Sequence, residues 1–401
     1  MTTDDRYAWW RLLASVLLAT LGGIGIWANV IVLTDIQREF GVDRGGASLP
    51  YAATMLGFGI GGLLMGRLID RYGAMWPMVA SSVFLACGFI LASQVQSYWQ
   101  FIAIQSILIG MLGMAITFGP LVADISHWFL RYRGLAVAAV ASGNYLAGSI
   151  WPSLINRLVA ADSWRFAYLV IGLVCLVTMV PLSFALRRRP DLQTNAEPQG
   201  GVHGRVKPPV TPWLLFGMIA LAGLACCVAM SMPQVHIVAY CSDLGYGPAR
   251  GAEMLSIMLA LGVVSRMVSG VIADRIGGLL TLILGSALQM LALIAYLPFD
   301  GLVSLYVVSA LFGLAQGGIV PSYALVIRQY FPAEEAGFRI SAVLTMTIAG
   351  MALGGWLSGE IFDLTGSYTA AFVNGIGWNV LNLAIAGWLL SLRRPARTAT
   401  V

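Results

Sequence analysis

The most distinctive chemical group in the sequence is the guanidinium of Arg266, which lies inside an otherwise apolar run. Asp274 follows eight residues later, so on a helix Arg266 lies about 12 Å inside the apolar layer. A charge at that depth is costly unless it faces a cavity or a partner. Because its planar donors hold a carboxylate through paired hydrogen bonds, we predict that Arg266 binds an organic anion. The alternative is a structural charge in a buried ion pair.

Several other polar or aromatic residues lie inside apolar runs at a similar depth. We predict that they line the same binding site: Trp27, Asn29, Thr117, Asn144, Tyr145, Tyr240, Gln316, Tyr323, Thr345 and Thr347. Aromatic residues in membrane helices also serve packing and interface roles, so each alone is weaker evidence than Arg266.

Other titratable residues are candidates for proton coupling and for gating. Histidine is the side chain that titrates near neutral pH, so His236 is a candidate for proton coupling, with helix packing as the alternative. A predicted gate consists of acidic and basic residues that pair between the halves in one conformation, the alternative being surface anchoring: Asp70, Arg71, Asp274 and Arg275. Asp124 is expected to join Arg131 or Arg133 in this network.

Motifs of enzymatic chemistry are absent from the sequence. There is no phosphate-binding loop, no HExxH and no Cys/His cluster, and the five cysteines show no CxxC spacing. The sequence therefore predicts no enzymatic activity, no cofactor and no metal site.

The composition determines which elements must position these residues. Hydrophobic residues make up 59% of the 401 positions and charged residues 10%, against about 25% charged residues in soluble domains. The mean hydropathy is +0.82. These values exclude a soluble enzyme, a secreted disulfide scaffold, a disordered chain and a nucleic-acid binder. A helix that crosses a bilayer needs about 20 mostly apolar residues, so the composition predicts a chain with many such helices.

The apolar runs predict an all-α membrane protein with twelve transmembrane helices in two pseudo-symmetric six-helix bundles. The runs fall near 10–35, 48–68, 74–94, 98–126, 133–157, 165–186, 213–240, 251–272, 278–298, 302–327, 338–360 and 368–391. The long polar stretch after the sixth run is rich in Pro, Gly and charged residues, a composition that is typical of a flexible linker. We therefore predict an N-terminal bundle at 1–187, a linker at 188–211 and a C-terminal bundle at 212–401.

Basic residues concentrate on the side that holds both termini and the linker, such as Arg187, Arg188 and Arg189. The opposite side holds five basic residues, namely Arg38, Arg44, Arg157, Arg165 and Arg250. By the positive-inside rule, we expect an inner-membrane protein with both termini in the cytoplasm.

The two halves of the chain repeat one another. GRLIDRYG at 66–73 matches GVIADRIG at 270–277 with a constant offset of 204, and SHWFLRYRG at 126–134 echoes RQYFPAEEAG at 328–337. The equivalent of Arg266 in the first half is Gly62, so the arginine belongs to one half alone. Related halves of six helices are typical of transporters whose site lies between them at mid-depth.

The paired G-x-[LI]-x-D-R-x-G segments and the long middle linker resemble the major facilitator superfamily over essentially the whole chain. The segments 126–148, 234–247 and 265–277 resemble its monocarboxylate porter branch, which includes oxalate/formate exchangers. This resemblance implies that Arg266 binds the substrate carboxylate. Animal members carry an acidic residue four positions earlier and a lysine in the first span, where this chain has Gly262 and Trp27. Oxalate exchangers carry a second cation in the eleventh span, which is missing here, so the pattern favours a monoanion.

The expected function is secondary active transport of an organic monocarboxylate by alternating access, coupled to a proton. The expected partners are the small anion, the proton and the lipid bilayer, and the protein is expected to be a monomer that binds no nucleic acid. Two alternatives stay open: an exporter of amphipathic drugs or metabolites, and a membrane sensor that does not transport.

Overall fold

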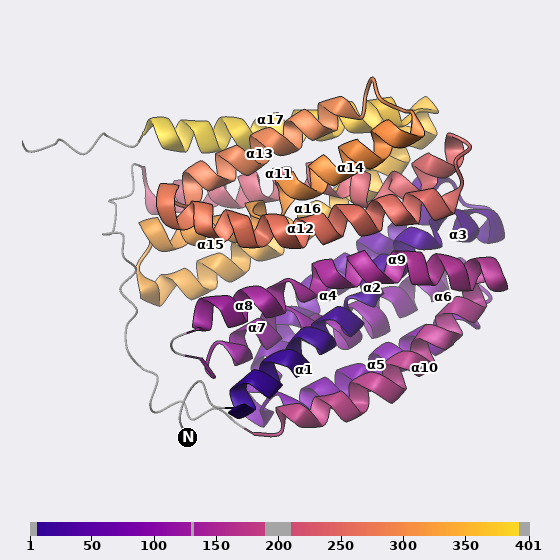
Figure 1. Ribbon diagram of the computed structural model, residues 1–401, viewed down its shortest axis with the longest axis horizontal. Helices are drawn as coiled ribbons and strands as arrows, with labels where there is room; N and C mark the ends of the chain where they lie inside the picture. Colours follow the sequence, from indigo (N-terminus) through magenta and orange to yellow (C-terminus); the bar gives the residue numbers. More distant parts are fainter. Residues whose placement is uncertain (1–5, 130–131, 189–209, 393–401) are drawn as a thin grey trace, which may run out of the picture.

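The computed structural model describes residues 6–129, 132–188 and 210–392, and every regular element within these ranges is a helix. Most of the predicted linker, 189–209, lies outside the described residues. We call 6–188 the first half and 210–392 the second half. We call the end of the molecule at which α1 begins and α17 ends the terminal end, and the opposite one the far end (Figure 1).

The first half crosses the molecule six times, and several of its crossings consist of more than one helical segment. The elements in chain order are α1 (Arg6–Gly22), α2 (Ile24–Ile31), α3 (Leu33–Phe40), α4 (Arg44–Tyr72), α5 (Met75–Ala92), α6 (Tyr98–Ala103), the π-helix η1 (Ile104–Met114), the 3₁₀ turn η2 (Ala115–Thr117), α7 (Gly119–Ile125), α8 (Arg133–Ala141), α9 (Gly143–Ala161), α10 (Trp164–Ser183) and the 3₁₀ turn η3 (Phe184–Leu186).

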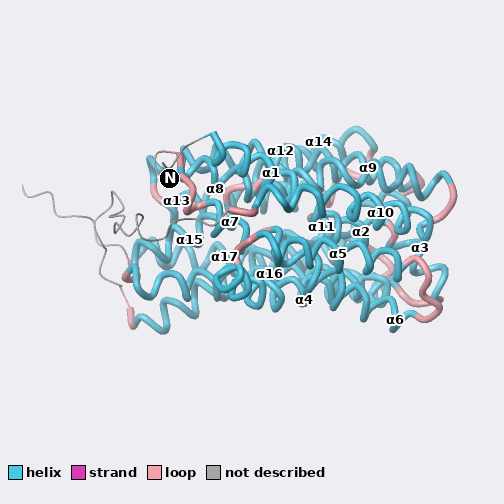
Figure 2. Tube along the Cα trace, turned by 90° about the horizontal axis from the view of Figure 1, so that it is seen from below, coloured by secondary structure: helices cyan, strands magenta, loops and turns pink. Residues whose placement is uncertain are grey.

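The second half has longer uninterrupted helices. Its elements are α11 (Pro212–Asp243), α12 (Pro248–Ile276), α13 (Gly278–Ala295), α14 (Leu302–Gln316), α15 (Ile319–Tyr330), α16 (Ala333–Thr365) and α17 (Tyr368–Ser391). The two halves lie side by side, with α4 packed against α16 and α9 against α12 (Figure 1). Figure 2 shows the helices running along the long axis, with most loops near the two ends.

Eleven helical segments of the described chain are long and apolar enough to cross a membrane. The remaining crossing is formed by α8 and α9, which are separated at Ser142 and carry polar residues such as Asn144 and Asn156. The predicted all-α fold with twelve crossings is therefore confirmed.

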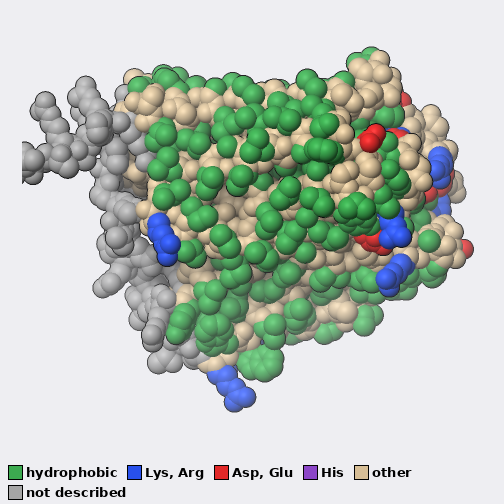
Figure 3. All heavy atoms as spheres, turned by 45° about the horizontal axis from the view of Figure 1, so that its top comes forward, with side chains coloured by type: hydrophobic (Ala, Val, Ile, Leu, Met, Phe, Trp, Pro, Cys, Tyr) green, Lys and Arg blue, Asp and Glu red, His purple; other side chains and the backbone are tan. Residues whose placement is uncertain are grey.

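The outer surface is suited to lipid. On the face shown in Figure 3, hydrophobic side chains cover the middle and charged side chains lie at the two ends. Large apolar residues such as Val177 and Leu291 are exposed in the described part of the chain. An exposed apolar belt between two charged ends is the pattern expected of helices that face acyl chains.

Several crossings are broken along their length, and three of these breaks position the candidate site. The breaks lie at Gly23 between α1 and α2, at Ser142 between α8 and α9, and at Gly317–Gly318 between α14 and α15. At two of them the glycine is needed for close approach: a Cβ on Gly23 would lie 2.6 Å from the Ala147 Cβ, and one on Gly317 would lie 2.3 Å from the Gly262 carbonyl oxygen. The breaks therefore bring irregular backbone to the contact between the halves.

Candidate functional site

Arg266 lies on α12 and reaches from the second half to the first. Its Nη1 donates to the carbonyl oxygen of Ala141 at 2.6 Å, and its Nε donates to that of Gly317 at 3.3 Å. The side chain is half-buried. The guanidinium also hydrogen-bonds to the side chain of Tyr145. These acceptors do not use all five N–H donors of a guanidinium, so part of the donor fork remains available to an anion.

The two carbonyls that hold Arg266 both lie at breaks in helices. Ala141 is the last residue of α8, and Gly317 follows directly after the end of α14. The helical donor for the Gly317 carbonyl would be the backbone N–H of residue 321, which is a proline and has none. Carbonyls at helix C-termini carry partial negative charge, so they stabilise a cation. The guanidinium is therefore stabilised without an acidic side chain at its depth.

The ring of Tyr145 lies against the guanidinium, with Cζ of Arg266 4.3 Å from the ring centroid. Gly262, one helical turn before Arg266, makes room for this ring, because a Cβ there would lie 2.7 Å from two of its carbons. An acidic side chain at 262 would overlap Tyr145. The departure from the pattern of animal monocarboxylate porters at this position thus has a steric reason.

Gln316 supplies a polar group beside the same turn of α12. Its side chain is fully buried, and its Oε1 accepts a hydrogen bond from Nε2 of Gln234. Its own Nε2 has no partner among the described residues and lies 3.7 Å from the Cβ position of Gly262. A buried donor without a partner is unfavourable by about 1–3 kcal/mol, so this amide is suited to donate to a bound acceptor.

Trp27 completes the part of the site that the first half contributes. Its Nε1 donates to the Asn144 carbonyl at 3.2 Å, and its ring lies against Gly148, next to Leu259 of α12. The amide oxygen of Asn144 points elsewhere, toward Gly23. The structure therefore brings Tyr145 and Gln316 to the turn of α12 that carries Arg266, and it places Trp27 at the same contact between the halves, beside Leu259.

Other predicted lining residues lie in the interior of their own bundle, away from the contact between the halves. Asn29 donates to Thr54 and Gln105 and accepts from Tyr168, in a buried polar cluster of the first half. The hydroxyl of Tyr323 lies 2.8 Å from Oδ1 of Asn382 and 3.0 Å from the Ala222 carbonyl oxygen in the second half, and its hydrogen is shared between these two acceptors. Satisfied buried networks of this kind stabilise and position a bundle, so these contacts indicate packing roles.

The predicted threonines also bond locally. The Thr117 hydroxyl donates to the Met114 carbonyl, and the side chain packs against Gly22. The hydroxyls of Thr345 and Thr347 donate to carbonyls of their own helix, α16. Tyr240 lies near the far end, where its ring contacts Tyr368 and Phe372. None of these contacts places the four residues beside Arg266.

His236 is fully buried and bonded through both ring nitrogens. Nε2 lies 2.8 Å from the carbonyl oxygen of Gly355, and Nδ1 lies 3.0 Å from the hydroxyl of Tyr368. A carbonyl only accepts, so Nε2 must carry the hydrogen, and in the neutral ring Nδ1 accepts the proton of Tyr368. The contacts thus define a single neutral tautomer.

Arg44 links the halves at the far end, and the sequence analysis did not identify it as a site residue. Its Nη1 donates to the Tyr368 hydroxyl at 2.8 Å, and its Nη2 forms a salt bridge with Asp243 at 3.1 Å. The backbone amides of Arg44 and Gly45 donate to the carboxylate of Asp363. The sequence did contain a signal for this contact: Asp243 and Asp363 lie at the far ends of α11 and α16, on the side of the membrane where Arg44 was predicted.

The residues of the predicted gate lie at the terminal end. Arg71 stacks on the ring of Tyr72 at 5.3 Å, and Asp274 and Arg275 are exposed. Within the described part of the chain, neither Asp274 nor Arg275 forms a salt bridge. The side chain of Asp70 lies outside the described residues. The gate therefore stays a prediction.

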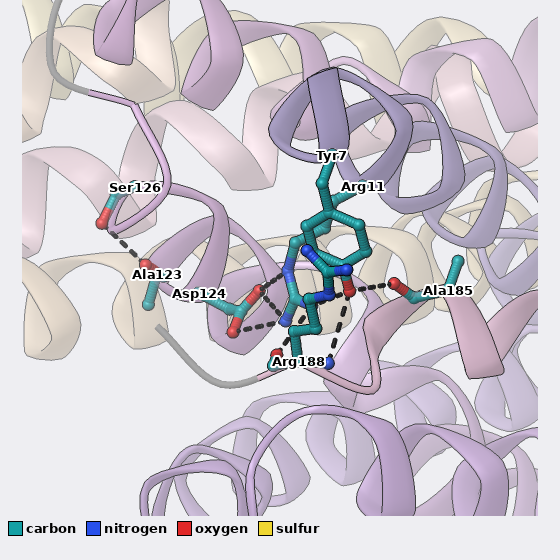
Figure 4. Close-up of polar contacts among 7 residues, drawn as sticks. All are labelled: Tyr7, Arg11, Ala123, Asp124, Ser126, Ala185 and Arg188. Atoms are coloured by element: carbon teal, nitrogen blue, oxygen red, sulfur yellow. Dashed lines mark hydrogen bonds and ion pairs between the residues drawn. The ribbon is translucent and has the colours of Figure 1, made fainter. Parts of the chain in front are cut away.

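Asp124 has a different partner from those expected. It forms a buried, bidentate salt bridge with Arg11 of α1, with N–O distances of 2.7–3.0 Å (Figure 4). Arg131 and the side chain of Arg133 lie outside the described residues. Arg11 also donates to the carbonyl of Arg188 at 3.1 Å, so the pair ties α1 and α7 to the end of the first half.

A cavity of about 290 Å³ lies at the far end, away from Arg266. Asp35 and Asn156 of the first half and Ser242 of the second half lie along its wall. Burial raises the pKa of Asp35, although Arg38 beside it acts in the opposite direction.

Comparisons with known proteins identify the family. The model of the Major Facilitator Superfamily matches residues 15–304. The chain belongs to the major facilitator superfamily. Its relatives include an agnestins efflux protein of Paecilomyces divaricatus, which is 25% identical over 91% of this chain and 83% of that protein. Monocarboxylate transporter 13 of Rattus norvegicus is 28% identical over 82% of this chain and 75% of that protein.

Solved structures of transporters share the fold of this superfamily member. A bacterial homologue of the human lysosomal transporter Spinster, in an inward-facing and occupied conformation, superposes with a TM-score of 0.72 at 14% identity, over 98% of this chain and 100% of that chain. A nucleoside transporter superposes with a TM-score of 0.71 at 14% identity, over 96% of this chain and 100% of that chain.

Proposed function

We propose that this superfamily member transports an organic monocarboxylate by alternating access and binds the carboxylate at Arg266. The observation that carries the proposal is a guanidinium that bridges the two halves and forms no salt bridge with a carboxylate among the described residues. The ring of Tyr145 lies against it, and the unpartnered Nε2 of Gln316 lies one helical turn away, beside Gly262. The similarity to a monocarboxylate transporter supports the same substrate class.

The number of cations near the site favours a monoanion. In the described part of the eleventh crossing, α16, the basic residue is Arg339 near the terminal end. Its guanidinium packs against Phe331 at 4.1 Å and Trp213 at 5.1 Å, away from Arg266. One guanidinium compensates one carboxylate, so a dicarboxylate would leave a second charge without a cation.

The setting in the cell follows from the charge distribution. We place the protein in the inner membrane as a monomer, with both termini and the linker in the cytoplasm. The terminal end is then cytoplasmic, and Asp70, Arg71, Asp274 and Arg275 would pair between the halves when that end closes. Asn144, whose carbonyl accepts from Trp27, would position that ring at the contact between the halves.

A binding screen tests the proposed substrate class. Purified wild-type protein should be stabilised against heat by short monocarboxylates, by about 2.7 kcal/mol at 100 times the dissociation constant. The matching neutral amides should give no stabilisation, because they carry no charge for the guanidinium. If amphipathic neutral compounds stabilise the protein and carboxylates do not, the chain is an exporter. The efflux relative and the carbonyl bonds that hold Arg266 without a substrate favour that alternative.

Proton coupling is proposed to involve His236. His236→Gln should abolish proton uptake driven by the substrate, while exchange of labelled substrate across the membrane persists, because glutamine keeps a donor and an acceptor but does not titrate. The measurement is the pH change outside proteoliposomes after substrate addition. Undiminished proton uptake by the variant would mean that the proton travels on another group or with the substrate.

A further inference from the structure

The far end of the molecule is closed by polar contacts that converge on Arg44. This residue begins α4 in the first half, and its side chain is 7% exposed. It contacts α11 through Asp243, α16 through Asp363 and α17 through Tyr368, all in the second half. Its guanidinium also lies over the ring of Phe362 at 4.7 Å. Separation of the halves at this end would break all of these contacts together.

His236 is linked to the contacts of Arg44 through the hydroxyl of Tyr368. The Nη1 hydrogen of Arg44 points to the Tyr368 oxygen, the Tyr368 hydrogen points to Nδ1 of His236, and Nε2 of His236 donates to the Gly355 carbonyl. Every donor in this chain meets an acceptor, and the chain runs from the first half into the core of the second.

We propose that this network is a pH-sensitive latch: neutral His236 allows Arg44 to close the far end, and protonation of His236 releases it. The latch consists of Arg44, Asp243, Asp363, Tyr368 and His236. Arg44 and Tyr368 are thereby residues of the transport cycle, although neither contacts Arg266 in the structure.

The physical reason is the direction of the hydrogen bonds. A protonated imidazole carries a hydrogen on Nδ1, which must then donate to the Tyr368 oxygen. That oxygen already accepts from Arg44, so two cations would share one neutral phenol oxygen. The hydrogen of Tyr368 would also lose its acceptor in a buried place, which is unfavourable. Moving Arg44 away relieves both effects.

The other ionisable groups around the latch do not offset this repulsion. They are Tyr240 and Asp243 on α11, Glu360 and Asp363 on α16, Tyr51 and Arg44 on α4, and Tyr368 on α17. Asp243 and Asp363 bond to Arg44 and Gly45, and Glu360 lies against Gly45. The described hydrogen bonds of His236 go to Tyr368 and Gly355, so no described carboxylate is bonded to the imidazole.

The burial of His236 links its protonation to the opening of the far end. The imidazole is fully buried in this closed arrangement, so a proton reaches it when the far end opens. Proton exchange and opening are then linked at one site. The inference concerns the far end alone and does not depend on the substrate class proposed for Arg266.

Spin labels at the far end test the latch in the full-length protein. Cysteines replace the exposed residues Arg38 of the first half and Asp300 of the second, in a Cys87→Ser background because Cys87 is the exposed native cysteine. The distance distribution between the labels is measured in nanodiscs without substrate at pH 8 and pH 5. In the labelled protein with the latch residues unchanged, the ratio of short to long distances should fall by at least about tenfold at pH 5, as for the loss of one hydrogen bond to a charged group.

Three variants decide whether His236 causes the change. Tyr368→Phe and His236→Gln remove the link or the titration, so each should give one distribution at both pH values. Arg44→Gln should give the long distance at both, and Arg44→Lys replaces it if the glutamine variant does not fold. A wild-type distribution that is independent of pH overturns the proposal. So does a pH effect that persists in His236→Gln, because the carboxylates beside Arg44 would then be the titrating groups.

Discussion

Replacement of Arg266 by alanine should abolish measurable transport and reduce monocarboxylate binding by at least about 100-fold. The expected loss corresponds to two hydrogen bonds to a charged group, at roughly 1.5–3 kcal/mol each, together with the attraction between opposite charges. Arg266→Lys should bind more weakly than the wild type but better than Arg266→Ala. Lysine keeps the charge, but it lacks the planar fork that bridges Ala141 and Gly317 and still faces the ligand.

The measurement is direct binding of a monocarboxylate panel to purified wild type and variants, followed by uptake into proteoliposomes. Arg250→Ala is the matched control, because Arg250 lies on the same helix, α12, and is exposed at the far end. It should bind the panel as the wild type does. Equal affinity of the wild type and Arg266→Ala for the same ligands would make Arg266 a structural bridge between the halves, and the exporter alternative would then replace the proposed function.

Asp124→Asn should lower the free energy of unfolding by about 3–5 kcal/mol, the range seen when one partner of a buried ion pair is removed. The side chains of Arg11 and Asp124 are 0% and 2% exposed, so the remaining guanidinium would be a buried charge without its counter-ion (Figure 4). Its contact with the ring of Trp128, at 4.5 Å, does not replace a carboxylate.

The double replacement Arg11→Met with Asp124→Leu should be less destabilising than Asp124→Asn, because it removes both charges. Stability is measured by unfolding in detergent with increasing denaturant. Arg38→Gln serves as the control, since Arg38 is 77% exposed and its pair with Asp35 is long, at 4.0 Å. It should change stability by less than about 1 kcal/mol. A loss for Asp124→Asn no larger than this would show that the pair contributes little to the fold.

The membrane fold follows from local properties of the sequence. Whether a segment crosses a bilayer depends on about 20 consecutive side chains, so the runs, the repeat at an offset of 204 and the depth of Arg266 were visible without a structure. The fifth crossing shows the limit of this signal, because the break at Ser142 interrupts it and polar residues occupy α9.

The neighbours of the site residues depended on tertiary structure. A helix that is apolar all round shows little periodicity, so its rotation is set by packing and not by the sequence pattern. Asn29 and Tyr323 therefore face the insides of their bundles, whereas Trp27 and Tyr145 face the other half.

The sequence by itself determined that Arg266 is a charge within the membrane, because depth follows from position along one helix. Only the tertiary structure decided what holds it: carbonyls at the ends of α8 and α14, which become acceptors where helices break. In the same way, Arg44 meets Asp363 and Tyr368 more than 300 residues later in the chain. Such contacts exist because two bundles close on each other, and no local pattern of residues records that closure.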